Sequence, residues 1–564
     1  MNYQNLKILT VFSLSTIAAF LFGWNALLNG PNATDHGDFA WKGYHIKRIG
    51  TGYSTRNYDV LRYDISMFVD PVKKKIDNRV RVTLTPVSDI ERLEFDLSSD
   101  LTVRNLTMGK KQIEFSHVSD RLIFDSDLKK GDTAEIVAQY SGDPSRKRNF
   151  FFGRINKVEV VYTLNEPENA NDWLVCNETP DDKALVSFAI TADSSLTSVS
   201  LGHLDSVSTN GAEGLRTYYW RSGIPLPTYL ISFFTSRYVV GRSEYQSTTS
   251  GKMLPLYVYG LPWQGSKFDR ILDDHKHFFE VFEKYFGEYP FPGEKYSVAA
   301  FLWQSGAMEY PTVSGFGSRL IDDYPAQQNI FIHELAHQWF GNSVSPKGWG
   351  DIWMNEGFAT FCEWLYLEEL DRKEKTNTLA RALIYAKEPE YLKGPLLNPE
   401  DLFAARVYIK GAWFLRMLRN ETGDEKFFTA IRDYYETFKY GNASTEDLIK
   451  IFEKASGRDL RDFFDQWVGS GEGIVALKVG EHTTTEKNRK YISTVEIKQV
   501  QSENRVYNVL LDIRYTGNGK TVVKKTRLNR KTQVIEVELD FKPDRLELDP
   551  DNFLLFRLVD DKEG

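Results

Sequence analysis

The chain has 564 residues, a formal net charge of −8 and a hydrophobic content of 41%. This length exceeds what one hydrophobic core supports and predicts three or four domains. The net negative charge does not indicate a basic surface for binding nucleic acid, so we expect no nucleic-acid partner. The two cysteines, Cys176 and Cys362, argue against a disulfide scaffold and favour free, buried thiols.

An apolar stretch follows Lys7 near the start of the sequence. Residues 8–22 have the length of the apolar region of a secretory signal, and they reach the length of a bilayer span only if they continue to Leu28. We assign residues 1–30 to a signal peptide or membrane anchor and favour the uncleaved anchor, because no A-x-A cleavage site follows. A buried core helix is the alternative. Either targeting signal predicts an extracytoplasmic location: secreted, periplasmic or membrane-anchored.

Residues 45–247 carry short runs of alternating apolar and polar side chains, such as Arg79 to Leu84, without a long helical pattern. A period of two residues indicates strands that are buried on one face. We therefore predict an all-β N-terminal domain over this range.

The pattern changes at Lys267, because apolar residues recur at helical spacing from there to Phe286. Within this helix His275 and His277 are two residues apart and face different directions, so both are predicted to be surface residues. Helical patterns dominate through Trp467 and predict a separate domain over residues 248–472.

A Gly-rich turn at residues 469–471 closes that region, and strand patterns return at 491–497 and 534–539. They predict a C-terminal β domain over residues 473–564, for which the family resemblance described below implies a β-sandwich. The predicted fold class is therefore α+β multidomain.

The stretch His333-Glu334-Leu335-Ala336-His337 carries the strongest chemical signal in the chain. Histidines at i and i+4 lie on one face of a helix, so both imidazoles can reach one metal ion about 2 Å away. Glu334 then projects beside the metal and can take a proton from water. The apolar neighbours of the motif predict a buried helix, in which histidines without a ligand would be costly.

A third ligand follows after eighteen intervening residues, at Glu356. Helical spacing continues from it to Leu365, which places Glu356 in the first turn of a second helix. Two histidines and one carboxylate leave a fourth position for water, the open arrangement of a catalytic zinc site. The pattern predicts one Zn²⁺ per chain, held by His333, His337 and Glu356, rather than a chance occurrence of the motif.

These motifs resemble those of the thermolysin-like gluzincins, in particular the aminopeptidase N type, whose pattern is HExxH, eighteen residues and then Glu. The resemblance runs from about Tyr162 to Val468 and includes separate matches at 173–184, 220–232, 306–312, 329–363 and 408–418. It implies a β-rich N-terminal domain, a thermolysin-like catalytic domain and a small β-sandwich. We expect the short three-domain form, because no sequence follows the last strands for the large helical domain of many relatives.

The resemblance also implies how the amino end of a peptide is held. The segment from Gly306 through Ala307 and Met308 to Glu309 and Tyr310 is similar to the family's G-x-M-E-N, whose Glu binds the substrate α-amine and whose backbone lines the substrate. A carboxylate near the metal explains cleavage at a chain end, since an interior residue has no ammonium group to pair with it. Tyr310 departs from the family's Asn, and an ordinary surface carboxylate is the alternative for Glu309.

Two further site residues are implied by the resemblance. Glu166 matches the Glu of the family's Gln-x-Glu element, although Leu164 replaces the Gln and should make the first side-chain pocket more apolar. A solvated loop charge is the alternative for Glu166. Tyr408 is similar to the Tyr of the family's Tyr-x-Lys-Gly segment, whose phenol stabilises the oxyanion of the tetrahedral intermediate.

Together these residues predict a zinc metallo-aminopeptidase that hydrolyses N-terminal residues from peptides by a metal-activated water. Glu334 activates the water, Tyr408 stabilises the oxyanion, and Glu309 with Glu166 holds the α-ammonium. Two alternatives stay open: a related zinc hydrolase with an altered substrate, such as an epoxide, and a non-catalytic peptide-binding protein that keeps the fold. The sequence predicts neither the preferred N-terminal residue nor the oligomeric state.

Overall fold

The computed structural model describes residues 56–147, 149–303, 306–370, 392–469, 474–501 and 505–559. These residues form two compact units. The amino-terminal unit takes residues 56–349 and 435–444, and the carboxyl-terminal unit takes residues 350–434 and 445–559. The predicted signal peptide or anchor at 1–30 lies outside the described residues, as does part of the turn at 469–471. The predicted domain boundaries stay predictions.

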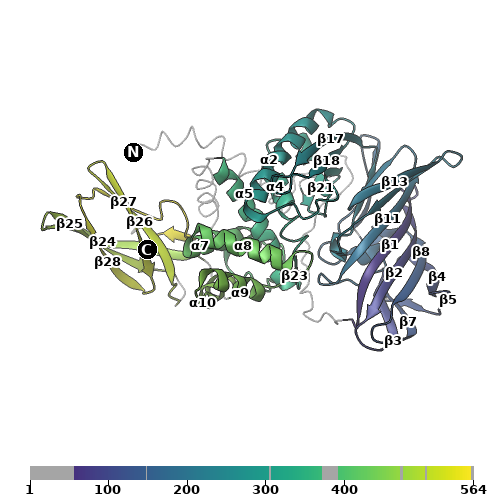
Figure 1. Cartoon of the computed structure of the whole chain (residues 1–564), viewed down its shortest axis with the longest axis horizontal. Coiled ribbons are helices and arrows are strands. Elements are labelled where there is room, and N and C mark those ends of the chain that lie inside the picture. Colours follow the sequence, from purple (N-terminus) through teal and green to yellow (C-terminus); the bar gives the residue numbers. More distant parts are fainter. Residues whose placement is uncertain are drawn as a thin grey trace. The chain divides into compact units, whose positions relative to one another are not determined.

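The amino-terminal unit begins with a β-rich part, as the alternating pattern predicts (Figure 1). Buried residues alternate along its strands, as at Val80, Val82 and Leu84, because successive side chains point to opposite faces. The largest sheet consists of β1 (Tyr58–Asp70), β2 (Lys75–Pro86), β4 (Thr102–Met108), β5 (Lys111–Gln112), β8 (Ala134–Gly142), β11 (Lys183–Asp193), β13 (His203–Asn210), β14 (Leu215–Arg221) and β15 (Leu226–Pro227). Its order is β13-β14-β11-β1-β2-β8-β4-β5, with β15 paired to β11.

Two smaller sheets complete this β-rich part. One contains β3 (Ile90–Asp96), β7 (Arg121–Leu128) and β6 (Ser116–Val118), in that order. The other has the order β12-β16-β10-β9 and consists of β9 (Phe150–Ile155), β10 (Val158–Thr163), β12 (Thr197–Ser200) and β16 (Phe233–Ser236). Because β10 ends at Thr163, this sheet fixes the start of the segment that carries Glu166.

A mixed sheet and three helices follow in the same unit. The sheet has the order β17-β18-β19-β21-β20, with β19 parallel to both β18 and β21. Its strands are β17 (Val239–Gln246), β18 (Met253–Gly260), β19 (Tyr296–Phe301), β20 (Ala307–Met308) and β21 (Ser314–Gly317), and the helices are α2 (Phe268–Phe286), α3 (Ser318–Asp322) and α4 (Gln328–Ala336). Figure 1 shows α2 beside β17 and β18. A short parallel pair joins β22 (Ser345–Pro346) to β23 (Asn442–Ala443).

The prediction that His275 lies on the surface is wrong. Its side chain is 2% exposed, and its ring lies 5.1 Å from that of Phe278 and 5.4 Å from that of Tyr296. Spacing along a helix separates two side chains but does not say which of them faces the core. His277 is exposed, as predicted, and α2 has the predicted extent.

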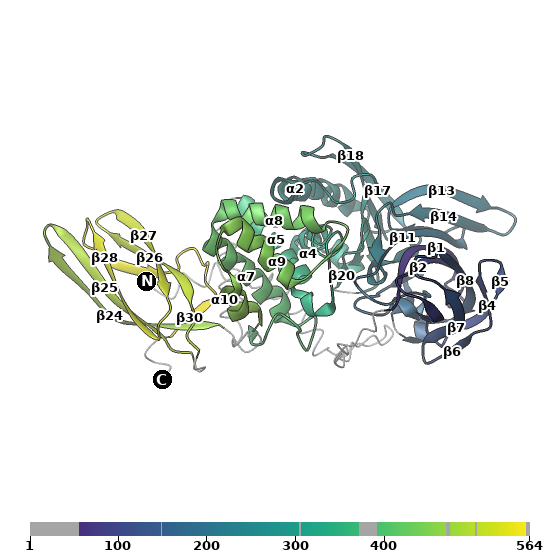
Figure 2. The same cartoon turned by 60° about the horizontal axis from the view of Figure 1, so that its bottom comes forward.

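The carboxyl-terminal unit begins with helices (Figure 2). They are α5 (Trp353–Glu369), α7 (Ala405–Thr422), α8 (Asp424–Phe438), whose end runs into the amino-terminal unit, α9 (Thr445–Ser456), α10 (Arg461–Phe464) and the short η7 (Asp465–Gly469). Helices α5 and α7 meet at two glycines: a Cβ atom on Gly357 would lie 2.9 Å from the Cα of Gly411. Among the described residues, no helix combines the length and apolar character that a membrane crossing requires.

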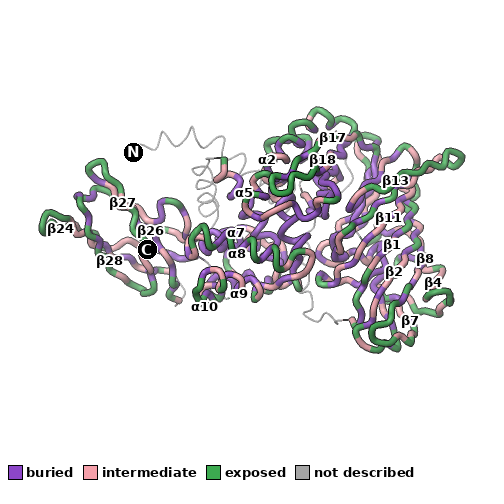
Figure 3. The backbone as a smooth tube through the Cα atoms, viewed as in Figure 1, coloured by how far each residue is buried: buried purple, intermediate pink, exposed green. Residues whose placement is uncertain are grey.

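Strands end the carboxyl-terminal unit, as predicted. One sheet has the order β28-β25-β24-β30 and the other β27-β26-β29, formed by β24 (Val475–Lys487), β25 (Lys490–Gln499), β26 (Val509–Gly517), β27 (Lys520–Leu528), β28 (Thr532–Leu539), β29 (Arg545–Leu548) and β30 (Phe556–Leu558). Glu421 of α7 accepts a 2.6 Å hydrogen bond from Arg527 of β27 and so ties the helices to the strands. The two cysteines are free and buried, as predicted. Figure 3 shows α5 and α7 as largely buried, whereas the loops between these strands are exposed.

Candidate active site

The HExxH motif occupies the end of α4. His333 lies in its last turn and His337 is its C-cap, where the backbone N–H of His337 donates to the carbonyl of His333 at 3.2 Å. The two imidazole rings lie 4.7 Å apart at 77° to one another. A ring nitrogen of each lies within 4.8 Å of the other, so the predicted i, i+4 arrangement is present.

The orientation of His337 is fixed by its surroundings. Its side chain is 1% exposed, and its Nδ1 lies 3.1 Å from the carbonyl oxygen of Phe340. In the neutral ring, an Nδ1–H donated to that oxygen leaves Nε2 unprotonated, which is the tautomer that a metal ligand needs. Two imidazoles in this arrangement suit a zinc ion.

Two carboxylates lie next to this histidine. One oxygen each of Glu309 and Glu334 and a ring nitrogen of His337 lie within 4.8 Å of one another. The exposures of Glu309 and Glu334 are 3% and 6%, so Glu309 is not the ordinary surface carboxylate of the alternative interpretation. Glu334 follows His333 in the helix, whereas Glu309 arrives from the segment after β20.

The segment before Glu309 is held against β21. Ala307 and Met308 pair with Phe316 and Gly315 as a short antiparallel ladder, and the N–H of Gly317 donates to the carbonyl of Gly306 at 2.9 Å. A Cβ atom at Gly306 would lie 2.2 Å from the ring of Trp303, so only glycine fits there. These contacts give Gly306 and Ala307 a defined backbone position.

Two polar side chains that the sequence did not single out fix the backbone of Glu309. The side-chain amides of Gln338 and Asn342 donate to the carbonyl of Glu309, at 2.8 and 2.6 Å. Gln338 also accepts a hydrogen bond from the N–H of Thr312 at 2.9 Å. Both side chains are buried. Their position in an apolar run next to the HExxH motif is the signal that could have found them, because buried polar groups need partners.

Glu166 belongs to the same cluster. One of its carboxylate oxygens lies within 4.8 Å of an oxygen of Glu309. Its neighbour Asn165 is buried and accepts a hydrogen bond from the indole N–H of Trp173 at 3.0 Å. The amino-terminal unit therefore brings together both histidines of the motif and the carboxylates of Glu166, Glu309 and Glu334.

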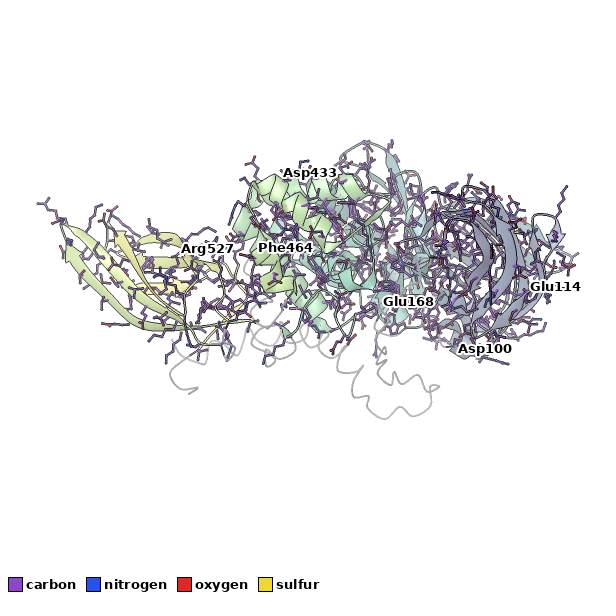
Figure 4. All side chains as sticks on the ribbon, turned by 90° about the horizontal axis from the view of Figure 1, so that it is seen from below. Asp100, Glu114, Glu168, Asp433, Phe464 and Arg527 are labelled. Carbon is purple, nitrogen blue, oxygen red and sulfur yellow. The ribbon has the colours of Figure 1, made fainter. Side chains whose placement is uncertain are left out.

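A further carboxylate, Glu168, lies two residues beyond Glu166 and is labelled in Figure 4. Burial raises the pKa of its carboxyl group to about 7, because removal from water disfavours the charged form. Glu168 therefore exchanges a proton near neutral pH.

Glu356 and Tyr408 belong to the carboxyl-terminal unit. Glu356 lies in the first turn of α5, as predicted, and is 4% exposed. Tyr408 lies in α7, one turn before Gly411, so both residues flank the glycine crossing of these helices. Lys410 in the same turn is fully buried and donates to the carbonyl of Gly394 at 2.9 Å, and burial lowers its pKa to about 7.

Comparisons with known proteins agree with this arrangement. The profile of the peptidase family M1 domain matches residues 270–467, and that of the peptidase M1 N-terminal domain matches residues 59–230. The chain therefore belongs to peptidase family M1, which confirms the resemblance drawn from the motifs.

The chain is similar to curated members of this family. It is 30% identical over 402 residues to the mitochondrial aminopeptidase 2 of Saccharomyces cerevisiae, covering 67% of this chain and 41% of that protein. It is 28% identical over 423 residues to the glutamyl aminopeptidase of Rattus norvegicus, covering 71% of this chain and 44% of that protein. The chain thus spans less than half the length of these relatives.

Solved structures share the fold. The aminopeptidase A of Legionella pneumophila, solved in complex with aspartic acid, aligns with a TM-score of 0.77 at 21% identity, over 91% of this chain and 60% of that one. An M1 zinc metallopeptidase from Deinococcus radiodurans aligns with a TM-score of 0.64 at 23% identity, over 76% of this chain and 97% of that one. They support the predicted α+β multidomain fold.

Proposed function

We propose that this chain is a zinc aminopeptidase that removes N-terminal residues from peptides. The observation that carries the proposal is the cluster of Glu309 and Glu166 with Glu334 and His337, because it combines a metal ligand, a base and an anionic pocket for an amine. The names of the relatives in family M1 support the same reaction.

One zinc ion per chain would be held by His333, His337 and Glu356. The tautomer favoured at His337 and the position of Glu356 in the first turn of α5 support this ligand set. When bound, zinc polarises the scissile carbonyl and lowers the pKa of water in the site.

Glu334 is the proposed general base. Its carboxylate takes a proton from the attacking water and returns it to the leaving amine. Tyr408 donates its phenolic O–H to the oxyanion that forms on the scissile carbonyl. Glu309 and Glu166 bind the α-ammonium of the substrate, while the backbone of Gly306 and Ala307 lines the peptide. A substrate without a free α-amine leaves these carboxylates without their cation, and this penalty restricts cleavage to the first residue.

The proposal is tested with purified full-length protein, aminoacyl reporter substrates and a chelator. Zinc should bind at one equivalent, and its removal should abolish hydrolysis. His337→Ala should lower bound zinc, whereas Glu334→Gln should keep the metal and lose turnover, because Gln cannot exchange the proton. Stoichiometric zinc in the His337→Ala variant would overturn the ligand assignment. Metal binding without hydrolysis of any reporter would favour the non-catalytic binding protein.

The location is a separate proposal, supported by the apolar stretch at residues 8–22. We propose an extracytoplasmic enzyme that is secreted, periplasmic or anchored by residues 1–30. Fractionation of the tagged full chain should recover it outside the cytoplasm, and deletion of residues 1–30 should retain it inside. Equal cytoplasmic recovery of both forms would contradict this location.

A further inference from the structure

Tyr310 stands where the family's G-x-M-E-N segment has Asn, directly after Glu309. Its side chain is 0% exposed. Its hydroxyl donates to the carbonyl of Thr163 at 2.8 Å and accepts a hydrogen bond from the N–H of Asn165 at 3.3 Å. One phenol therefore joins two segments that are 147 residues apart in the sequence.

Further hydrogen bonds hold the 163–165 segment, to which the Tyr310 hydroxyl is bonded. The side chain of Asn165 accepts a hydrogen bond from Trp173 at 3.0 Å and donates one to the carbonyl of Ile231 at 2.5 Å. The hydroxyls of Thr163 and Ser232 lie 2.9 Å apart. Because these bonds hold the 163–165 segment in place, a bond from the Tyr310 hydroxyl fixes the distance between this segment and the backbone at Tyr310.

The two carboxylates of the proposed amine site lie next in sequence to the residues that these hydrogen bonds connect. Glu166 follows Asn165, Glu309 precedes Tyr310, and their carboxylate oxygens lie within 4.8 Å of one another. The bond from Tyr310 to the 163–165 segment therefore lies one residue along the chain from each of these carboxylates.

We propose that the Tyr310 hydroxyl is the positioning group that holds Glu166 and Glu309 at a fixed separation, so that the pair is preformed for one α-ammonium. This inference rests on the proposed function, because it assigns the amine site its geometry. It also gives a role to the Tyr that stands where the family has Asn, since the phenol connects the two segments.

The first test is Tyr310→Phe, which removes the hydroxyl and keeps the ring. With free-amine reporters, KM should rise about fivefold, the effect of one lost hydrogen bond, while kcat stays within about twofold. The preference for L-leucinamide over 4-methylpentanamide, which lacks the amine, should fall by the same factor in inhibition or calorimetry. An unchanged KM and an unchanged amine preference would overturn the inference.

Tyr140→Phe is the matched control. Tyr140 is also 0% exposed, and its hydroxyl donates to the carbonyl of Trp173 at 3.0 Å and accepts from the N–H of Val175 at 3.1 Å. Both variants should lose similar stability, but only Tyr310→Phe should weaken amine binding. An equal rise of KM in both variants would mean that Tyr310 contributes only to packing.

If Tyr310→Phe does not fold, Ser232→Ala is the alternative variant, because it removes the hydroxyl that lies 2.9 Å from that of Thr163. It should raise KM less than Tyr310→Phe and keep kcat. An unchanged KM in Ser232→Ala would equally contradict the inference.

A double variant tests whether the hydroxyl acts through the carboxylate pair. If the hydroxyl positions Glu166 relative to Glu309, then Tyr310→Phe should raise KM little further once Glu166→Gln has removed one of the two carboxylates. Multiplicative losses would mean that the hydroxyl acts independently of the carboxylate pair. Wild-type protein that binds L-leucinamide but hydrolyses nothing would reject the proposed function alone, whereas hydrolysis by the wild type with an unaffected Tyr310→Phe would reject this inference alone.

Discussion

The side-chain amide of Gln338 donates a 2.8 Å hydrogen bond to the backbone carbonyl of Glu309. Gln338 directly follows His337, so one side chain connects the end of the HExxH helix to the segment proposed to bind the substrate amine. Its oxygen accepts a second bond from the N–H of Thr312, which fixes that segment on the far side of Glu309.

Gln338→Met should therefore lower both stability and activity. Methionine has a similar shape but leaves a buried carbonyl and a buried N–H without this partner, which costs about 1–3 kcal/mol of unfolding free energy. Gln264→Met is the matched control, since Gln264 is 1% exposed and likewise bonds the backbone of Leu261 and Ser318. Denaturant unfolding should show similar losses of unfolding free energy in the two variants, while kcat/KM should fall only for Gln338→Met. An unchanged kcat/KM would show that this bond does not position Glu309.

Gly357→Ala should disrupt the crossing of α5 and α7. The added Cβ would lie 2.9 Å from the Cα of Gly411. The atoms it meets belong to the backbone of α7, so no flexible side chain can move away to make room. Overpacking of this kind costs about 1–3 kcal/mol, and because Glu356 is the preceding residue, bound zinc should fall as well. Gly265→Ala, where the same methyl meets nothing within 4 Å, is the control. Unchanged zinc content and thermal stability in Gly357→Ala would contradict the packing argument.

Tyr408→Phe isolates the proposed oxyanion donor. It removes one O–H and little volume, so zinc content and unfolding should be preserved while kcat falls by about 10²–10³, the usual effect of losing such a donor. Steady-state kinetics with one good reporter, together with metal analysis, measures both quantities. A kcat equal to that of the wild type would assign the oxyanion to another residue.

Glu168 should contribute to the pH dependence of stability. Burial raises the pKa of its carboxyl from 4.5 to about 7, so the folded protein binds more protons than the unfolded chain between these values. Its contribution is therefore fully present below pH 4.5 and is lost as the pH rises to about 7. Glu168→Gln stays neutral, so the decline in unfolding free energy between pH 5 and 7 should be smaller in this variant. Identical pH profiles for the two proteins would contradict this assignment.

The sequence predicted the elements whose signal is local. Helical spacing located α2 and α5, and the alternation of side chains located strands in both β-rich regions, because each pattern follows from the geometry of one element. It did not reveal β19, whose residues are all buried. A strand buried on both faces has no alternation, so its apolar run cannot be told from a buried helix.

The candidate site divides in the same way. The HExxH spacing is a property of one helix, so His333, Glu334 and His337 could be predicted from it. The bond from Tyr310 to Thr163 joins residues 147 positions apart, and no local pattern carries that information. The burial of His275 likewise depends on Tyr296, which belongs to a strand of the sheet beneath α2.

The clustered carboxylates of Glu309 and Glu166 are the residues that we propose restrict cleavage to the amino end of a peptide. The most direct measurement compares hydrolysis of one peptide with a free and with an N-acetylated amino end, by the wild type and by Glu309→Ala. The wild type should cut the free peptide and refuse the blocked one. Glu309→Ala should lose about 2–5 kcal/mol in kcat/KM, as for one partner of a buried charge pair, and should narrow the difference between the two peptides. Efficient cleavage of the N-acetylated peptide by the wild type would contradict the assignment as an aminopeptidase.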